Sequence, residues 1–128
     1  MNNIDRNTVS LHATWYILPG CELDAEQALK QLACDVQEQE PDTLMYVIHT
    51  PLPAADPLHS LPPSSPHLVV FFETYRNADA FQRHLTGPVF TKFVTDHQHL
   101  FLAANGHPFN LVSFLETRAG FIRPGMLA

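Results

Sequence analysis

The sequence predicts a single α+β domain with a four-stranded antiparallel sheet and the element order βαββαβ, the ferredoxin-like arrangement. Its 128 residues fit one ordinary domain, which is expected to span residues 1–128. Apolar residues make up 45 % and charged residues 16 % of the chain, as is typical of a globular protein with a hydrophobic core. Strand-like alternation and helix-like spacing of apolar side chains follow one another along the chain in that order.

The first half of the chain is predicted to form a strand, a helix and a second strand. Residues 9–18 are rich in β-branched and aromatic types, with apolar side chains at alternate positions. Asp24, followed three residues later by Gln27, resembles a capping box that opens a helix, and Pro41 ends this helix. Residues 43–50 have the composition of a second strand. The side chains expected in the core are Ala25, Ala28, Leu29, Leu32 and Val36 of the helix, and Leu44, Tyr46 and Ile48 of the second strand.

A proline-rich loop separates the second predicted strand from the third. Residues 51–66 contain six of the eleven prolines of the chain. Each proline lacks a backbone donor and fixes φ, so we expect no regular structure there. Residues 67–75 are apolar on both faces in their middle, which predicts a strand near the centre of the sheet.

The last part of the chain is predicted to form a bent pair of helices and a final strand. Asn77 is the expected N-cap of a helix over residues 78–86. Gly87-Pro88 breaks this helix, and proline suits the first position of the next one. Residues 109–118 predict the final strand, and residues 119–128 form a tail.

This order of elements leaves one face of the sheet without helices, because both helical segments of a split βαβ unit cover the same face. A strand that is apolar on both sides would then expose an apolar patch, which soluble monomers rarely do. We therefore expect a homodimer in which two sheets pack face to face, a dimeric α/β barrel. The alternative is that the proline-rich loop or the tail covers the open face.

The composition also excludes several classes of partner. The formal net charge is −6, and the seven Lys and Arg residues are scattered, so nucleic acid is not an expected ligand. Cys21 and Cys34 are too few for a disulfide framework and are expected to be reduced. No apolar run approaches the roughly 20 residues that span a bilayer, and the first eight residues do not resemble a signal peptide. We expect a cytoplasmic protein that is not bound to a membrane.

Two segments carry a resemblance to a known family: EPDTLMY at residues 40–46, and FFETYRNADAFQRHLTGPVFTKF at residues 71–93. They are similar to the antibiotic biosynthesis monooxygenase family, whose members carry E-P-G-small-L, a strand ending in E-x-Y, and A-F-x-x-H. The resemblance covers most of the chain outside the loop and the tail. It implies a dimeric α/β-barrel fold, in a family that includes cofactor-free oxygenases of aromatic quinols, isomerases and haem-degrading enzymes. The matching residues are Glu40, Pro41, Leu44, Glu73, Tyr75, Ala80, Phe81 and His84.

His84 is the candidate catalytic residue. It shares a helical face with Ala80 and Phe81, so its imidazole is expected to point towards the sheet, into a space walled by aromatic rings. A neutral histidine there could accept a proton from a phenol or enol, and the resulting anion could give an electron to O2. The alternative is a core histidine that is hydrogen-bonded to Tyr75, Thr74 or a backbone carbonyl.

The expected substrate-binding residues surround this base. Trp15, Phe72 and Phe81 are candidates for the aromatic walls. His12 would line the same pocket if its face of the first strand looks towards the helices. Glu73 and Tyr75 share one face of their strand, expected to look into the dimer interior, and could orient a substrate hydroxyl or satisfy one another as a buried pair.

No metal or haem site is expected. The eight histidines show no spacing typical of a metal site on one strand or helix. The haem-degrading relatives have an asparagine, a tryptophan and a histidine ligand at the positions that hold Ala13, His84 and Val94 here, so this chain departs from their pattern at all three.

Two functional hypotheses follow. The first is a cofactor-independent monooxygenase or related enzyme, with His84 as the base, that acts on a small aromatic or quinol-type substrate. The second is a non-catalytic dimeric barrel that binds a hydrophobic small molecule or a partner.

Overall fold

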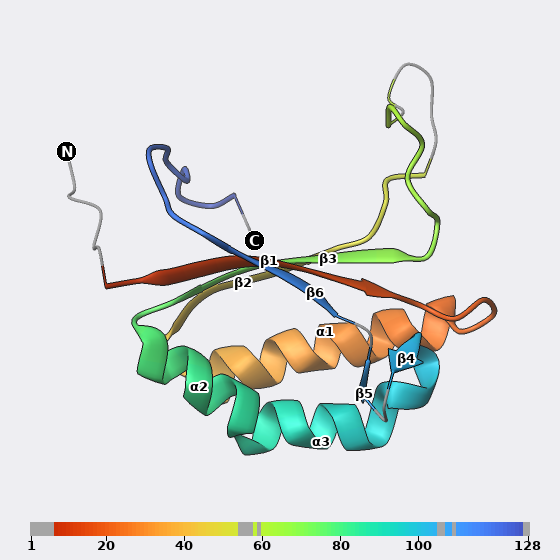
Figure 1. Cartoon of the computed structure of the whole chain (residues 1–128), viewed down its shortest axis with the longest axis horizontal. Helices are drawn as coiled ribbons and strands as arrows, with labels where there is room; N and C mark the ends of the chain where they lie inside the picture. Colours follow the sequence, from red (N-terminus) through yellow and green to blue (C-terminus); the bar gives the residue numbers. More distant parts are fainter. Residues whose placement is uncertain (1–6, 54–57, 59, 105–106, 109, 127–128) are drawn as a thin grey trace.

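The computed structural model describes residues 7–53, 58, 60–104, 107–108 and 110–126. It confirms the predicted α+β class, with one four-stranded antiparallel sheet in the order β2-β3-β1-β6. Helices α1, α2 and α3 all lie on one face of this sheet (Figure 1). The elements are β1 (Val9–Tyr16), α1 (Glu22–Gln39), β2 (Thr43–His49), β3 (Leu68–Tyr75), α2 (Ala78–Thr86), α3 (Pro88–His97), the 3-10 helix η1 (Gln98–Leu100), the hairpin strands β4 (Ala103–Ala104) and β5 (His107–Pro108), and β6 (Leu111–Leu115).

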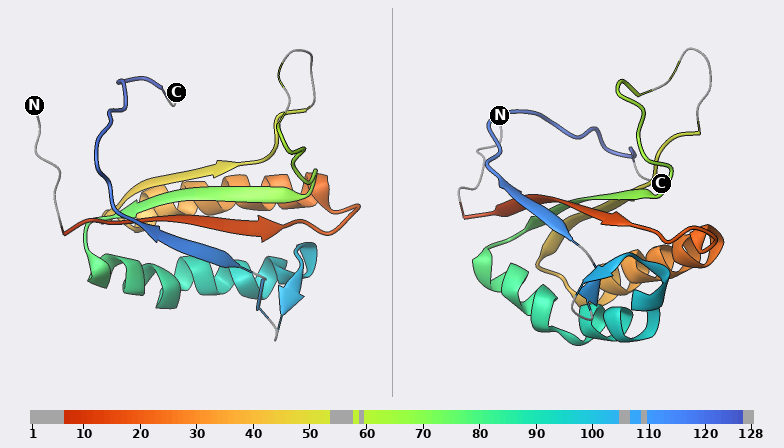
Figure 2. Two further views of the ribbon diagram at one scale, coloured as in Figure 1. Left: turned by 45° about the horizontal axis from the view of Figure 1, so that its top comes forward. Right: turned by 45° about the vertical axis from the view of Figure 1, so that its right-hand side comes forward.

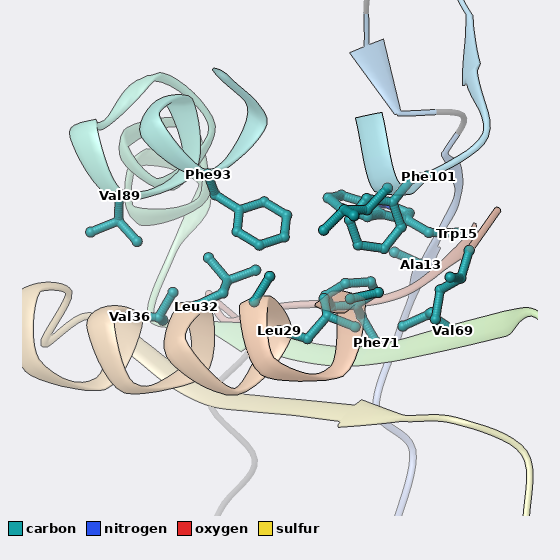
Figure 3. Close-up of a cluster of buried hydrophobic side chains, with 14 of the residues drawn as sticks. Ala13, Trp15, Leu29, Leu32, Val36, Val69, Phe71, Val89, Phe93 and Phe101 are labelled. Carbon is teal, nitrogen blue, oxygen red and sulfur yellow. The ribbon is translucent and has the colours of Figure 1, made fainter. Parts of the chain in front are cut away.

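The core lies between the sheet and the helices. Every second residue of β1 and β3 is buried there, and the apolar stripe predicted for α1 is buried in full. Trp15 is at the centre of an aromatic cluster, with its ring 5.0 Å from that of Phe71 and 5.2 Å from that of Phe101 (Figure 3). Burial of one such large side chain contributes about 1.5–3 kcal/mol. The register of this face is therefore strongly fixed, since a slip by one residue would expose all of it.

The orientation of β3 differs from the expectation that Glu73 and Tyr75 look into a dimer interior. Val69, Phe71, Glu73 and Tyr75 face the helices of their own chain and not a dimer interior. The cause is the antiparallel pairing with β1, in which Leu11 lies opposite Glu73 and forms part of the same buried face. The intervening residues of β3, including Phe72, lie on the open face.

Some boundaries also differ from the sequence-based expectation. The helix α1 begins at Glu22, after Cys21, so Asp24 lies within its first turn and is not the cap. In β2 the pairing with β3 shifts between Thr43 and Met45. This irregularity takes Leu44 out of the alternation and leaves it 46 % exposed, whereas Tyr46 and Ile48 pack against the core as expected.

The C-terminal elements show two further differences. The strand predicted over residues 109–118 is shorter, at Leu111–Leu115, and residue 109 lies outside the described residues. The hairpin β4–β5 was not predicted, because strands of two residues are too short for alternation to be recognised.

The bend between α2 and α3 fixes the position of His84. The side chain of Asn77 accepts a hydrogen bond from the backbone N–H of Ala80, which confirms it as the N-cap of α2. Gly87 ends α2, and Pro88 occupies the first turn of α3. A Cβ atom at Gly87 would lie 2.5 Å from the carbonyl oxygen of Arg83, so a larger residue would disturb the end of α2. His84 therefore lies about one turn before Gly87, where the chain bends close to the backbone carbonyl of Arg83.

In the described part of the chain, no helix or second sheet covers the face of the sheet opposite α1, α2 and α3. Phe72 remains 41 % exposed there. The segment after β2 and the tail after β6 extend on this side of the sheet (Figures 1 and 2). In residues 51–66, the described part forms no helix and no strand beyond an isolated bridge at Leu58. The tail does not pack on the sheet, because its apolar residues Phe121 and Ile122 are 78 % and 66 % exposed.

Candidate functional site

His84 is buried, with only 3 % of its surface exposed, and lies at the boundary between two cavities. Its imidazole is surrounded by the rings of Tyr46, Tyr75 and Phe90, whose centres lie 5.2–5.4 Å from its own. The expected orientation is therefore present: the side chain points from α2 towards the sheet, into an aromatic environment. The three rings come from β2, β3 and α3, so the tertiary fold is needed to assemble this environment.

The polar partner of His84 is Glu40. Nδ1 of His84 lies 2.7 Å from Oε1 of Glu40, the residue that follows the last turn of α1. The same carboxyl oxygen accepts a hydrogen bond from the hydroxyl of Thr43 at 3.1 Å. An ionised carboxylate can only accept hydrogen bonds, so it holds the proton of a neutral imidazole on Nδ1. The second ring nitrogen, Nε2, is then left with its lone pair free to accept a proton.

The inner cavity lies between the sheet and the helices. It has a volume of about 30 Å³, which is room for one or two water molecules. The rings of Trp15, Phe71, Phe81 and Phe90 make most of its wall. Glu73, Tyr46 and His84 contribute polar groups to it. The remaining lining residues are Leu11, Ala13, Leu85, Asn110 and Val112.

The mouth of this cavity is formed by apolar side chains of α2 and the edge strand β6. Leu85 is 37 % exposed and Val112 is 41 % exposed. Next to them, the rings of Phe81 and Phe114 meet edge to face at 5.4 Å, with Phe114 63 % exposed. Exposed apolar side chains grouped at the entrance of a cavity are typical of a site for an apolar ligand.

The outer cavity is larger, about 340 Å³, and lies on the other side of His84. Glu40, Asp42 and Arg83 contribute charged groups to its wall. Asp42 is held by Arg76 at 2.8 Å and by Arg83 at 2.9 Å, and these two cations lower the pKa of its carboxyl group. Glu40 lines the outer cavity and contacts Nδ1 of His84. The outer cavity therefore adjoins the Nδ1 side of the imidazole.

Burial alters the acid–base properties of the polar groups at the inner cavity. It raises the pKa of Glu73, against the opposing effects of the hydrogen bond from Tyr75 and of the charge that His84 carries when its imidazole is protonated. Burial also raises the pKa of Tyr46 well above its usual value, and the carboxylates of Glu73 and Glu40 add to this effect. For Tyr75 the pKa is raised by burial first and then by Glu73, to which its hydroxyl donates a hydrogen bond. The phenols of Tyr46 and Tyr75 therefore remain protonated at neutral pH.

The structure brings together only some of the residues expected at the site. Trp15 and Phe81 line the inner cavity with His84. Tyr75 is fully buried behind Glu73 and is not among the lining residues. Phe72 and His12 lie on the open face of the sheet, where their rings contact each other at 5.5 Å. The register places them there, because Ala13 and Phe71 occupy the helix-facing positions next to them.

Glu40 and Tyr46 are the site residues that the sequence analysis did not assign. Glu40 is part of the E-P pair at the end of α1, but its contact with His84 joins positions 44 residues apart. Spacing along one helix or strand cannot reveal such a pair. Among the described residues, no group of three or more His, Cys, Asp and Glu side chains is arranged to hold a metal ion. No helix in the described ranges has the length and apolar character needed to cross a membrane.

Comparison with known proteins agrees with this architecture. The profile of the family described as antibiotic biosynthesis monooxygenase matches residues 8–96, which include β1 to α3 and with them Glu40, Glu73 and His84. The chain belongs to the antibiotic biosynthesis monooxygenase family. No curated protein gives a significant match.

Several solved structures of this kind share the fold. A protein of Caulobacter crescentus CB15, provisionally named an antibiotic biosynthesis monooxygenase, has a TM-score of 0.68 and 17 % identity over 89 % of this chain and 92 % of its own. The protein PA3566 of Pseudomonas aeruginosa has a TM-score of 0.67 and 20 % identity, with coverage of 92 % and 100 %. A variant of SnoaB, a cofactor-independent oxygenase of Streptomyces nogalater, has a TM-score of 0.62 and 14 % identity, with coverage of 91 % and 99 %. At these identities the likeness concerns the fold.

Proposed function

We propose that this family member is a cofactor-independent monooxygenase acting on a small aromatic or quinol-type substrate, with His84 as its general base. The observation that carries the proposal is the orientation of His84. Glu40 holds Nδ1, and His84 lines a cavity whose wall is mostly aromatic and apolar. A carboxylate that fixes the tautomer of a histidine base is a recurring catalytic arrangement. The SnoaB relative, named as a cofactor-independent oxygenase, supports the same reaction class.

The size of the inner cavity restricts how the substrate binds. A cavity that holds a benzene molecule has a volume of about 150 Å³, whereas the inner cavity has about 30 Å³. We therefore place only the reacting edge of the substrate and O2 in the inner cavity. The rest of the ring lies at the mouth, against Leu85, Val112 and Phe114, which are exposed and apolar. Because β6 is an edge strand that pairs with β1, we expect a small shift of β6 to widen this entrance.

The chemistry begins with removal of the hydroxyl proton of the substrate by Nε2 of His84. The phenolate is electron-rich and gives an electron to O2, after which a ring carbon and oxygen form a bond. His84 returns its proton to the peroxide anion, so a hydroperoxide results and the base is neutral again. The aromatic wall keeps water away from the anion, and the step uses the base and O2 without a bound cofactor.

The proposal includes a homodimer formed through the open sheet face. Phe72, Leu111 and Leu115 are exposed on that face, and no described segment packs on them. The apolar residues of the tail are exposed on the same side of the sheet. A second copy of the sheet would cover these side chains, as expected for a dimeric α/β barrel.

The test of the enzymatic proposal is O2 uptake with a panel of hydroquinones and anthrone-like phenols. Wild-type protein should consume O2 with at least one of them, without an added metal or cofactor. A His84→Gln variant should lose this activity. If neither protein consumes O2, the non-catalytic binding hypothesis replaces the enzymatic one.

A further inference from the structure

We propose that Glu73 is a second catalytic residue, an acid that protonates the leaving oxygen when the peroxide breaks down. The proposal rests on the proposed function, and it assigns a role to a buried carboxyl group that the steps above do not use. The product of the step would be a quinone and one water molecule.

The geometry places Glu73 and His84 on the wall of the same small cavity. Both side chains line the inner cavity, and its volume of about 30 Å³ holds a group no larger than one or two water molecules. We therefore expect a peroxide in that space to contact both side chains. Glu73 is fixed on β3 and His84 on α2, so the acid and the base approach the peroxide from different elements.

The surroundings of Glu73 suit an acid. Its side chain is buried, with 6 % of the residue exposed. Oε1 accepts a hydrogen bond from the hydroxyl of Tyr75, and in the described part of the chain no protein group is hydrogen-bonded to Oε2. A neutral carboxyl group can carry its proton on this second oxygen and donate it to a ligand. Burial favours that neutral form, because it raises the pKa of Glu73.

Other titratable groups near the cavity do not take this role. The pKa of Tyr46 and that of Tyr75 are raised, so neither phenol is a good proton donor at neutral pH. Glu40 is bonded to Nδ1 of His84 and lines the outer cavity instead. Asp42 and Arg83 belong to the wall of the outer cavity too. Glu73 is thus the carboxyl group that faces the inner cavity.

His84 takes the hydrogen from the ring carbon that bears the peroxide, and the electron pair of that C–H bond forms the new C=O bond. The O–O bond breaks, and the departing oxygen takes the proton of Glu73 and leaves as water. His84 then holds one extra proton and Glu73 lacks one. The water molecule, confined between them, returns the proton from His84 to Glu73.

The experiment uses the full chain and the ratio of quinone formed to O2 consumed. In Glu73→Gln the amide still accepts the hydrogen bond from Tyr75 and fills the same space, but it is not an acid. We expect O2 uptake to continue while quinone formation falls by about 10²-fold or more, with hydroperoxide or hydrogen peroxide released instead. The control is Tyr75→Phe, which removes the hydrogen bond and keeps the acid, and whose product ratio should match wild type.

A second measurement does not depend on activity. Infrared spectroscopy over a series of pH values should show, in the wild-type protein, the C=O stretch of a protonated carboxyl group that persists above the usual titration range of glutamate and is missing in Glu73→Gln. Absence of this band in wild type, or an unchanged product ratio in an active Glu73→Gln, overturns the role of Glu73 while the proposed function stands. Absence of O2 uptake by wild type overturns the proposed function, and the step assigned to Glu73 with it.

Discussion

Nδ1 of His84 and Oε1 of Glu40 lie 2.7 Å apart, although 44 residues separate the two positions in the chain. The contact joins the bent helix pair α2–α3 to the point where α1 ends and β2 begins. It fixes the ring of His84 between the inner and the outer cavity, with a defined tautomer.

Substitutions of Glu40 should show whether it fixes the tautomer of His84 or only contributes to the free energy of unfolding. In Glu40→Gln the amide oxygen can still accept the Nδ1 proton, so we expect the Nδ1-H tautomer in the ¹⁵N NMR spectrum of the ring. In Glu40→Ala the imidazole loses this partner, the tautomers should mix, and the free energy of unfolding should fall by about 1–3 kcal/mol. Thr43→Val removes only the hydroxyl bonded to Glu40 and should leave the tautomer unchanged. An Nε2-H tautomer in wild type would contradict this description.

Glu73 should make the stability of the protein depend on pH in a defined direction. Its folded-state pKa is raised from the ordinary value of 4.5, so the folded chain binds this proton more tightly than the unfolded chain. The contribution is present in full below about pH 4.5 and is lost as the pH rises through the folded-state pKa, with a slope of at most about 1.4 kcal/mol per pH unit.

The measurement is the difference in the free energy of unfolding between Glu73→Gln and wild type as a function of pH. The variant is neutral at every pH, so the difference should grow in its favour above about pH 4.5. Groups that titrate alike in both proteins, such as Asp42, cancel in this comparison. A difference that is constant with pH would show that Glu73 titrates in the folded chain as it does in the unfolded one.

Phe72 should determine the oligomeric state. A charge at this position would lie on the open sheet face, between the rings of His12 and His49. We expect Phe72→Glu to be monomeric in sedimentation velocity at a concentration at which wild type is dimeric, because two such carboxylates would be buried in the interface. Leu23→Glu alters a leucine on α1 that is 77 % exposed and should leave the dimer intact. A wild-type monomer at micromolar concentration would refute the dimer.

The sequence was sufficient for the fold because its signals are local. The alternation in β1, the stripe of α1 and the N-cap Asn77 each act within one element, and the structure confirms all three. The inward orientation of His84 follows from the same reasoning, since it shares a face with Ala80. Local pattern failed at Leu44, where a change of register against β3 interrupts the alternation.

The site was less predictable because it depends on the pairing of distant elements. Phe72 and Phe71 are neighbours with similar side chains, and only the register with β1 decides which of them faces the helices. For the same reason, the sequence did not show whether His12 faces the helices or the open side of the sheet. The partner of His84 is Glu40, whose position at the end of α1 becomes close to α2 only when the helices pack on the sheet.

The central claim is that Nε2 of His84 is the base of an oxygenase, and O2 uptake with a phenolic substrate tests it most directly. His84→Gln can keep a hydrogen bond to Glu40 but supplies no base, so uptake per folded molecule should fall by about 10²- to 10⁴-fold. His12→Gln, a histidine on the opposite face of the sheet, should keep the wild-type rate. His84 is not the base if His84→Gln loses O2 uptake only in proportion to its unfolded fraction, measured by circular dichroism.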